Sequence, residues 1–572
     1  MMPTDEGMPV TEAVATVLAG LGADTAFGVV GSGNFMVTNA LIARGTRYVA
    51  ARHECGAAVM ADAWARMTGK PGILSVHQGP GLTNALTGIT EAAKSRTPLI
   101  VLTADVASAA TRSNFRIDVA ALAASVGAVA FRPRSPGFAV DETVRAYRTA
   151  ATGRRTVVLA LPLDVQAGAC TLPPVAPAGP LPAVVPSAAA AGALAGALAR
   201  ARRPVFIAGR GTRIAAARAD LERLAARCGA LLATSAAGKG LFRGSPWDLD
   251  VSGGFASPLA AELIRGADLV VGWGCSLNMW TLRHGALIGP DATVIQVDDD
   301  PAAIGAHRPV ALGVTGDVAL TARAAAQALD GGPGSVPGRK TGGGETGCGA
   351  DGRAGYRSAA LRDRIAAQIR WRDVPYEDQG DDRSIDPRTL TIALDDLLPA
   401  ERIVVVDSGN FMGYPSMFLA VPDADGFCFT QGYQSVGLGL ASAIGSAIAR
   451  PDRLTVAALG DGGALMGISE LETVVRLGLP MVIVVYDDEA YGAEVHHFGP
   501  GGHSLSTVRF PPAKIAKIGR GFGCQGITVR RRRDLRAVQQ WLDGPRDQPL
   551  LIDAKVASSR ASWWLEEAFR GH

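Results

Sequence analysis

Three segments of the chain repeat one rhythm, in which a helical period is followed by a short apolar strand and then by glycine. Alternating strands and helices predict parallel sheets flanked by helices, and ligands of such sheets bind at the carboxyl ends of the strands. We therefore expect an α/β protein with three domains, each built on a mainly parallel sheet. The predicted strands are Thr25–Val29, Arg47–Ala51, Gly72–His77, Leu99–Thr103 and Thr156–Ala160 in the first segment, Pro204–Ala208, Leu231–Thr234, Leu269–Trp273 and Thr293–Asp298 in the second, and Ile403–Asp407, Leu454–Leu459, Met481–Tyr486 and Leu550–Ala554 in the third.

Composition marks the boundaries between these segments. A chain of 572 residues is too long for a single core. The stretch 171–187 is rich in Pro and Ala and indicates a linker, and 330–355 holds so many glycines that we predict a disordered surface linker. The expected units are an N-terminal domain over 1–172, a middle domain over 188–328, a Gly-rich and partly disordered linker over 329–384, a third domain over 385–560 and a C-terminal tail over 561–572.

Charge and cysteine usage exclude several classes of protein. The 56 basic and 53 acidic residues leave a formal net charge of +3, which argues against a nucleic-acid-binding surface. No apolar run approaches the length of a membrane span. The seven cysteines are scattered and never spaced as CxxC, which argues against a structural zinc site. With no signal peptide recognised, we expect a cytoplasmic protein with reduced thiols.

Two carboxylates follow consecutive strands of the third segment. Asp461 lies in the Gly-Asp-Gly-Gly turn at 460–463, ahead of a helix expected to begin near Ser469, and Asp488 follows the next strand. Adjacent parallel strands end about 5 Å apart, so both carboxylates can bind one Mg²⁺. That Mg²⁺ would hold a diphosphate, because it usually combines few protein carboxylates with phosphate oxygens. From the turn alone, two solvated loop aspartates are the simpler interpretation.

Further motifs place this turn in a family. The chain contains FGVVGSGN (27–34), RHECGAAVMADAWARMTGKPG (52–72) and GPGLTNALTGITEA (79–92), then RPVFIAGRG (203–211), ADLVVGWG (267–274) and IQVDDDP (295–301), and finally GDG (460–462) followed by DD (487–488). In this order the motifs resemble the thiamine-diphosphate-dependent enzymes, in particular their acetolactate-synthase-like branch, over residues 10–325 and 385–556. The resemblance implies pyrimidine-binding (PYR), middle and diphosphate-binding (PP) domains, with thiamine diphosphate and Mg²⁺ as cofactors.

The resemblance also implies roles for single residues. Glu54 matches the glutamate that activates the cofactor by a hydrogen bond to its aminopyrimidine ring. Val436, in QSVGLGLASAIG (434–445), takes the place of a larger Met or Leu that bends the cofactor, and the carbonyl of Gln434 accepts from the aminopyrimidine. The family binds the metal through the second Asn of its NN pair, where this chain has Asp488, while Asp487 is interpreted as structural. The metal ligands are then Asp461, Asp488 and the Ala490 carbonyl, and the remaining cofactor contacts are Ser408, Gly409, Asn410, Phe411, Gly460, Gly462, Gly463, Tyr491 and Gly492.

The substrate side of the site leaves the reaction open. Ser32 and His77 match a serine and an acid–base histidine of benzoylformate decarboxylases, and Glu494 matches an acid–base glutamate of pyruvate decarboxylases. Gln78 and His496 complete the set of candidate catalytic residues, although His77 could instead only bond to the backbone and Glu494 and His496 could be surface residues. The overall pattern favours decarboxylation of a 2-oxo acid followed by ligation to an aldehyde or keto acceptor, whereas the acid–base groups favour release of an aldehyde. A catalytically silent paralogue is the alternative from another class, and retention of Glu54 argues against it.

Nucleotide binding and assembly are the last expectations. The middle segment WGCSLNMWTLRHG (273–285) contains no motif that indicates whether FAD, ADP or no nucleotide binds there. The resemblance implies that Glu54 of one subunit meets the metal turn of another, so that a homodimer is the minimal active unit, paired further into a homotetramer.

Overall fold

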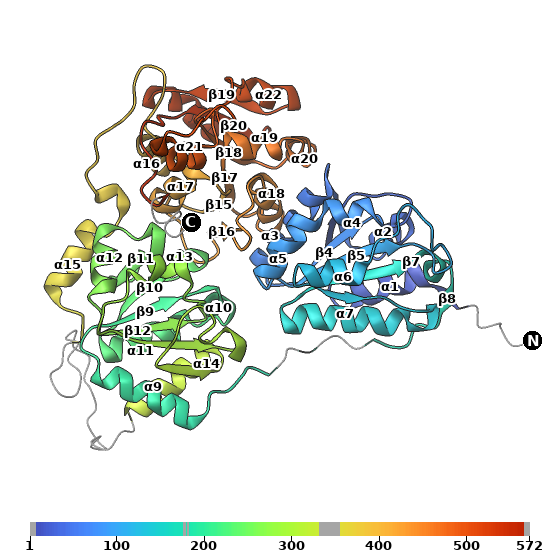
Figure 1. The fold of residues 1–572 in the computed structure, drawn as a ribbon, viewed down its shortest axis with the longest axis horizontal. Helices are drawn as coiled ribbons and strands as arrows, with labels where there is room; N and C mark the ends of the chain where they lie inside the picture. Colours follow the sequence, from blue (N-terminus) through green and yellow to red (C-terminus); the bar gives the residue numbers. More distant parts are fainter. Residues whose placement is uncertain (1–6, 176–178, 180–181, 331–354, 566–572) are drawn as a thin grey trace, which may run out of the picture.

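The computed structural model describes residues 7–175, 179, 182–330 and 355–565, and its core is three six-stranded parallel sheets (Figure 1). The central strands are runs of buried apolar residues, such as Met-Val-Ile-Val-Val-Tyr-Asp in β18 (Met481–Asp487). Strands of this kind need helices on both faces of their sheet. The predicted α/β class with three mainly parallel sheets is therefore confirmed.

The N-terminal and C-terminal sheets have the same strand order. In the N-terminal domain the order is β3-β2-β4-β5-β7-β6, and in the C-terminal domain it is β16-β15-β17-β18-β20-β19. Numbered along each domain, both read 2-1-3-4-6-5. The strands are β2 (Thr25–Gly28), β3 (Arg47–Ala50), β4 (Gly72–Val76), β5 (Leu99–Asp105), β6 (Val129–Phe131) and β7 (Thr156–Pro162), and β15 (Arg402–Val406), β16 (Phe427–Phe429), β17 (Leu454–Gly460), β18, β19 (Gln525–Val529) and β20 (Leu550–Lys555).

The middle sheet has a different order. It runs β11-β10-β9-β12-β13-β14, which reads 3-2-1-4-5-6 and is the order of dinucleotide-binding folds. Its strands are β9 (Pro204–Ala208), β10 (Leu231–Thr234), β11 (Asp248–Val251), β12 (Leu269–Trp273), β13 (Thr293–Asp298) and β14 (Leu312–Thr315). A separate antiparallel pair, β1 (Met8–Pro9) with β8 (Ala169–Cys170), closes the N-terminal domain.

Helices connect the strands within each domain. The N-terminal domain contains α1 (Val10–Gly20), α2 (Phe35–Ala43), α3 (Glu54–Thr68), α4 (Pro80–Asn84), α5 (Leu86–Lys94), α6 (Val119–Ser125), α7 (Ala139–Gly153) and α8 (Leu163–Gln166). The middle domain contains α9 (Ala188–Arg200), α10 (Arg210–Ile214), α11 (Arg218–Cys228), α12 (Pro258–Arg265), α13 (Met279–Leu282) and α14 (Val318–Asp330), and α15 (Ala359–Gln368) follows it. The C-terminal domain contains α16 (Pro387–Leu397), α17 (Gly413–Phe418), α18 (Gly439–Ala449), α19 (Asp461–Met466), α20 (Glu470–Arg476), α21 (Gly492–Phe498), α22 (Ile515–Phe522) and α23 (Arg536–Asp543).

Helices α3 and α18 join the N-terminal to the C-terminal domain, and they lie side by side in Figure 1. A Cβ atom at Gly445 would lie 2.2 Å from the carbonyl oxygen of Met60, so this close approach requires glycine. Apolar side chains of both helices belong to one continuous core cluster. The two domains therefore share a core within one chain.

Differences from the sequence predictions concern edges and segment ends. The core strands lie within two residues of their predicted bounds. The missed strands are β1 and β8 of the small antiparallel pair and five edge strands of the large sheets, β6, β11, β14, β16 and β19. The helix expected near Ser469 is α20, which begins at Glu470 with Ser469 as its N-cap residue, and the shorter helix α19 that precedes it was missed.

The segment interpreted as a linker is partly folded. Residues 331–354 lie outside the described part of the chain, but α15 follows them and packs on the middle domain through buried Ile365. The hydroxyl of Tyr356 also donates to the carbonyl of Leu263 in that domain. Among the described residues, no helix is both long and apolar enough to cross a membrane.

Candidate functional site

All three sheets have a switch point where the strand order reverses, and the sequence motifs lie there. In an open parallel sheet, the crevice outside the carboxyl ends of the two strands at this point is the usual ligand site. The switch point lies between β2 and β4 in the N-terminal sheet, between β9 and β12 in the middle sheet, and between β15 and β17 in the C-terminal sheet. Ser32 and His77 follow the first pair of strands, and Asp407 and Asp461 follow the last pair.

Ser32, His77 and Gln78 meet at the N-terminal switch point. Oγ of Ser32 lies 3.3 Å from Nε2 of His77, and Nδ1 of His77 lies 2.7 Å from the carbonyl oxygen of Gln78. Glycines of the VGSGN turn make room for these side chains, because a Cβ at Gly31 would lie 2.6 Å from the His77 ring and one at Gly33 would lie 1.7 Å from Oε1 of Gln78. Oε1 of Gln78 is buried and has no hydrogen-bond partner among the described residues.

Glu54 begins helix α3. Its carboxylate accepts a hydrogen bond from the side chain of Asn84 at 3.1 Å. The backbone just before it is held from the C-terminal domain, since the buried carboxylate of Glu470 accepts from the N–H groups of Arg52 and His53, each at 3.1 Å. Within the described part of the chain, no hydrogen bond connects Glu54 to the residues of the C-terminal switch point.

Asp461 and Asp488 lie close enough to interact electrostatically, as expected from their positions after two neighbouring strands. Gly460 of β17 is in register with Tyr486 of β18, so the two carboxylates follow neighbouring strands. Burial and then the charge of Asp488 raise the pKa of Asp461 to about 8. Burial also raises the pKa of Asp488 to about 6, although a hydrogen bond from the Asn410 side chain acts against it. Two buried carboxylates that repel each other favour a bound cation.

The residues around this pair fit a Mg²⁺ ion that carries a diphosphate. Both side chains offer hard oxygen ligands, and glycines leave space beside them, because a Cβ at Gly492 would lie 2.3 Å from Oδ2 of Asp488. In the described ranges no group of three or more His, Cys, Asp or Glu side chains is arranged to hold a metal. A site with two carboxylates therefore depends on ligands from the diphosphate, as Mg²⁺ sites commonly do.

Asp487 has a separate partner. Its side chain is buried and forms an ion pair with Lys555 at the end of β20, and Lys555 also lies 3.2 Å from Asp553. Lys555 thus offsets the charge of Asp487 beside the metal pair. This arrangement agrees with the interpretation of Asp487 as structural.

The loop that follows β15 is tied to the loop that carries Gln434 and Val436. The buried carboxylate of Asp407 accepts from the N–H groups of Ser408 at 2.8 Å, Gly437 at 3.1 Å and Leu438 at 3.2 Å. Gln434 has a positive φ of 61°, and the Val436 side chain is 37% exposed. Both loops therefore keep one relative position beside the metal pair.

Two aromatic contacts support the same region. Phe411 stacks on Tyr486 at 5.3 Å between ring centroids, and a Cβ at Gly460 would meet the Phe411 ring at 2.8 Å. A Cβ at Gly462 would likewise lie 2.7 Å from the Tyr491 ring. Ala490 forms an isolated antiparallel bridge with Arg509, which anchors the loop after β18.

Glu494 and His496 both lie on α21. Residues two apart on a helix do not share a face, so the two side chains point in different directions. Nε2 of His496 is buried without a hydrogen-bond partner among the described residues, and burial followed by the charge of Arg509 lowers the pKa of His496.

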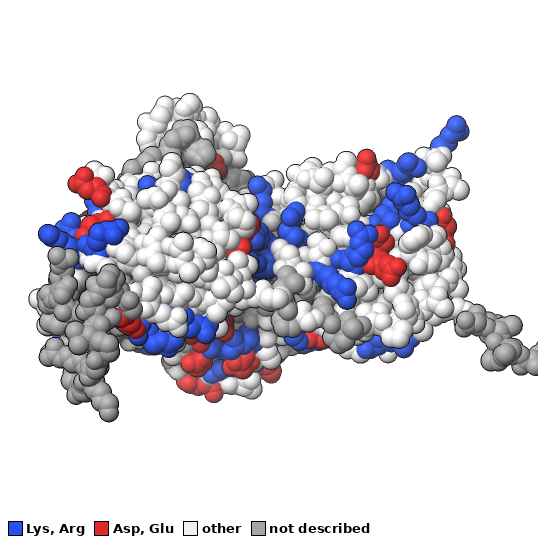
Figure 2. All heavy atoms as spheres, turned by 90° about the horizontal axis from the view of Figure 1, so that it is seen from below, with Lys and Arg blue, Asp and Glu red and all other residues white. Residues whose placement is uncertain are grey.

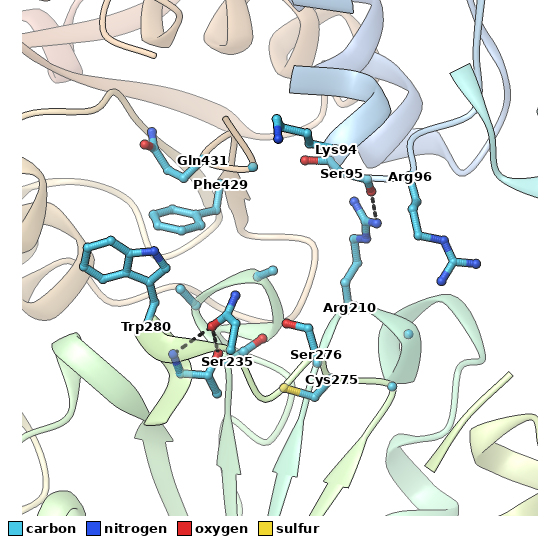
Figure 3. Close-up of a pocket in the computed structure, with 18 of the residues that line it drawn as sticks. Lys94, Ser95, Arg96, Arg210, Ser235, Cys275, Ser276, Trp280, Phe429 and Gln431 are labelled. Atoms are coloured by element: carbon cyan, nitrogen blue, oxygen red, sulfur yellow. Dashed lines mark hydrogen bonds between the residues drawn. The ribbon is translucent and has the colours of Figure 1, made fainter. Parts of the chain in front are cut away.

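A cavity of about 400 Å³ lies where the three domains meet (Figure 3). It opens at the middle switch point, where Arg210 follows β9 and reaches the carbonyl of Ser95 in the N-terminal domain. Burial and then the charge of Arg66 lower the pKa of Arg210 to about 9. Basic side chains also gather along the boundary between the middle and N-terminal domains in Figure 2. Asp298 and Asp299 also line the cavity, and Gln434 lies in its wall.

Several residues that support the site were not among the predicted site residues. Asp407, Glu470 and Lys555 each hold a loop or a charge next to a predicted site residue. Asp407 and Lys555 stand at strand ends, which is the signal that could have identified them. Glu470 binds a backbone 417 residues away, at His53, and no local pattern indicates such a contact.

Comparisons with known proteins match the chain on all three domains. The model of the thiamine pyrophosphate enzyme N-terminal TPP binding domain matches residues 8–122, that of the central domain 191–325, and that of the C-terminal TPP binding domain 407–554. The chain is 30% identical to a probable 2-ketoarginine decarboxylase of Pseudomonas aeruginosa, over 96% of this chain and 94% of that protein. It is 28% identical to the acetolactate synthase isozyme 2 large subunit of Escherichia coli, over 96% of each chain. It is also 28% identical to a sulfoacetaldehyde acetyltransferase of Rhodobacter capsulatus, over 96% of this chain and 94% of that protein.

Proposed function

The chain belongs to the thiamine pyrophosphate enzyme family, and on that premise we propose that it decarboxylates a 2-oxo acid and protonates the product to release an aldehyde. When bound, thiamine diphosphate supplies a carbon nucleophile that adds to the 2-oxo group and accepts the electrons left by the departing CO₂. In this proposal Asp461, Asp488 and the Ala490 carbonyl hold Mg²⁺. The loops at 408–411 and 434–436 hold the cofactor. The carboxyl group of Glu54 holds a proton at the aminopyrimidine ring of the cofactor.

The contact between Ser32 and His77 is the observation that carries the proposal. The carbonyl of Gln78 can only accept, so Nδ1 of His77 carries the hydrogen that joins them at 2.7 Å. Nε2 is then left facing the hydroxyl of Ser32 at 3.3 Å. An imidazole held in this way is positioned to deliver a proton to a neighbouring reacting atom, which is the step that aldehyde release needs.

Carboligation is the second candidate. It is supported by similarity over nearly the whole chain to proteins named acetolactate synthase and sulfoacetaldehyde acetyltransferase. The sequence pattern alone favours this reaction, and the Ser32–His77 contact moves our first choice to protonation. Both reactions share the decarboxylation and differ in whether a proton or an acceptor carbonyl is used next.

Exposed apolar side chains support assembly into at least a homodimer. Near the N-terminal switch point Val30, Phe35, Met36 and Phe115 are 41–63% exposed, and near the C-terminal one Val436, Leu465, Met466 and Tyr491 are 37–56% exposed. Large exposed apolar side chains that gather next to a site favour burial by a partner. A second copy would bring Glu54 of one subunit to the metal pair of the other, in a homodimer or homotetramer that light scattering would detect.

A substrate panel tests the function. Purified protein with thiamine diphosphate and Mg²⁺ is given a series of 2-oxo acids, including a guanidino-substituted one, with and without an aldehyde acceptor. Free aldehyde as the product in both arms supports the proposal, and a product heavier by the acceptor supports carboligation. Calorimetry with the cofactor alone comes first, because absence of binding would exclude both reactions and leave a catalytically silent protein.

A further inference from the structure

The last described residues of the chain fold back onto the loop at 408–411. We define residues 561–565 as the C-terminal strap. The hydroxyl of Ser562 lies 2.6 Å from the carbonyl oxygen of Asn410 and 2.9 Å from its Oδ1, and the indole Nε1 of Trp564 donates to the same carbonyl at 3.0 Å. The backbone N–H of Ser562 also points to Oδ1, at 3.5 Å. The strap therefore directs three donors at one residue of the predicted cofactor site.

These contacts decide how the Asn410 amide is turned. The Asp488 carboxylate can only accept and the Ser562 N–H can only donate, so the amino group of the Asn410 amide faces Asp488 and its oxygen faces the strap. Nδ2 of Asn410 and Oδ2 of Asp488 lie 2.9 Å and 2.3 Å from the position that a Gly492 Cβ would occupy. A chain of hydrogen bonds thus runs from the strap through Asn410 to the metal pair.

Packing holds the strap against two domains. Trp564 is 6% exposed, and a Cβ at Gly413 would lie 2.0 Å from its ring, so glycine is needed beneath it. Trp564 and Leu565 join a core cluster with Phe255 of the middle domain. The guanidinium of Arg283, also in the middle domain, lies 4.3 Å from the centroid of the Trp563 ring. The strap is therefore fixed by the middle domain on one side and contacts the site on the other.

We propose that Ser562 and Trp564 are positioning residues of the cofactor site, which set the amide of Asn410 so that it supports Asp488 and the diphosphate loop. The proposal rests on the proposed function, because it assumes that this loop binds thiamine diphosphate. Binding of the cofactor and docking of the strap on Asn410 are then linked, and by reciprocity each must strengthen the other by the same factor.

The test measures affinity for thiamine diphosphate at saturating Mg²⁺ by calorimetry, on the full-length protein. Ser562→Ala removes the hydroxyl donor, and Trp564→Phe removes the indole donor but keeps an aromatic ring. Ser558→Ala is the matched control, since Ser558 is exposed and makes no hydrogen bond among the described residues. We expect the dissociation constant to rise about fivefold in Ser562→Ala and in Trp564→Phe, the effect of one lost hydrogen bond, and to stay within about twofold in Ser558→Ala.

Proteolysis gives a readout that does not depend on mutation. The Arg560 side chain is 70% exposed, so trypsin can cleave next to the strap. We expect thiamine diphosphate with Mg²⁺ to slow cleavage after Arg560 in the wild type, and to slow it less in Ser562→Ala. Unchanged affinity in both strap variants, together with unprotected cleavage in the wild type, would overturn the proposal while leaving the proposed function intact. If the wild type binds no thiamine diphosphate, the proposed function itself fails.

Discussion

Glu470 of the C-terminal domain accepts a hydrogen bond from the backbone N–H of His53 at 3.1 Å, one residue before Glu54. A second carboxylate makes the reverse contact, from the N-terminal domain to the backbone of the C-terminal domain. Glu91 of the N-terminal domain accepts from the N–H groups of Gly432 at 2.9 Å and Tyr433 at 2.6 Å, just before Gln434. Both carboxylates are buried, at 2% and 0% exposure. Each domain thus holds the cofactor loop of the other within one chain.

Substitution of Gly56 tests whether Glu470 positions Glu54. A Cβ at Gly56 would lie 2.5 Å from Oε1 of Glu470, so Gly56→Ala displaces that carboxylate from the Arg52 and His53 N–H groups. We expect kcat to fall roughly 10- to 100-fold through misplacement of Glu54, with cofactor affinity within about twofold of the wild type. Gly20→Ala is the control, because nothing lies within 4 Å of its added Cβ. Equal rates in the two variants would show that the contact is only structural.

Removal of the Glu54 carboxyl tests its proposed role directly. Glu54→Gln keeps the size of the side chain and can still contact Asn84, but it cannot exchange a proton with the aminopyrimidine. We expect turnover to fall roughly 100- to 10,000-fold, the usual contribution of a positioned acid or base, while thiamine diphosphate still binds. Steady-state kinetics with calorimetry on the same preparation separates the two effects. Unchanged turnover would refute the role.

Replacing Asp488 tests the repulsion inside the metal pair. Asp488→Asn removes one of two buried like charges without a change in size, so the metal-free protein should become more stable. We expect its melting temperature at pH 8 to rise by roughly 1 °C for each kcal/mol of repulsion removed, because the unfolding entropy scales with the length of the chain. Mg²⁺ added together with thiamine diphosphate should then stabilise the wild type more than the variant. If the wild-type melting curves with thiamine diphosphate coincide with and without Mg²⁺, a shared cation site is contradicted.

The Glu91 contact predicts a dependence of stability on pH. Burial alone would raise the pKa of Glu91, but Arg66 and the N–H groups of Gly432 and Tyr433 lower it below its ordinary value of 4.5. The unfolded chain therefore takes up a proton first as the pH falls, so this stabilisation is present above about pH 4.5 and is lost below it. Glu91→Gln should destabilise the protein at pH 7 and flatten the acid side of its stability curve. Urea unfolding between pH 3 and 7 measures this, with Asp547→Asn as an exposed carboxylate control.

His77 decides the fate of the product in our proposal. His77→Ala should lower the rate of aldehyde release roughly 100-fold or more, because it removes the positioned proton donor. In the presence of an aldehyde acceptor, the share of ligated product should rise in this variant, since protonation no longer competes. Product masses from both arms check this. A variant with the wild-type rate would assign His77 a role in the glycine-rich turn alone.

The features that could be predicted from the sequence are those marked by a short stretch of neighbouring residues. The central strands are continuous apolar runs, so their bounds could be read directly, whereas missed strands such as β6 and β16 are three residues long and lie at sheet edges. The proximity of Asp461 and Asp488 could be predicted because each directly follows one of two neighbouring strands. Glu91, Glu470 and Ser562 could not, because their partners lie 341, 417 and 152 residues away along the chain. Contacts of this kind depend on domain packing, which no short motif encodes.

The shared strand order of the first and third sheets has a consequence for the interface between them. The docking helices α3 and α18 both follow the second strand of their domain, and the helices that carry Glu91 and Glu470, α5 and α20, both come between the third strand and the fourth. Helix α3 therefore packs on its structural equivalent α18. The contact of Glu91 with the loop before α18 is likewise equivalent to the contact of Glu470 with the residues before α3. This is the pattern of an isologous, two-fold symmetric dimer. A single chain of this protein is therefore built as a pseudo-symmetric pair, in which a substitution on one side of the interface has a definable mirror substitution on the other.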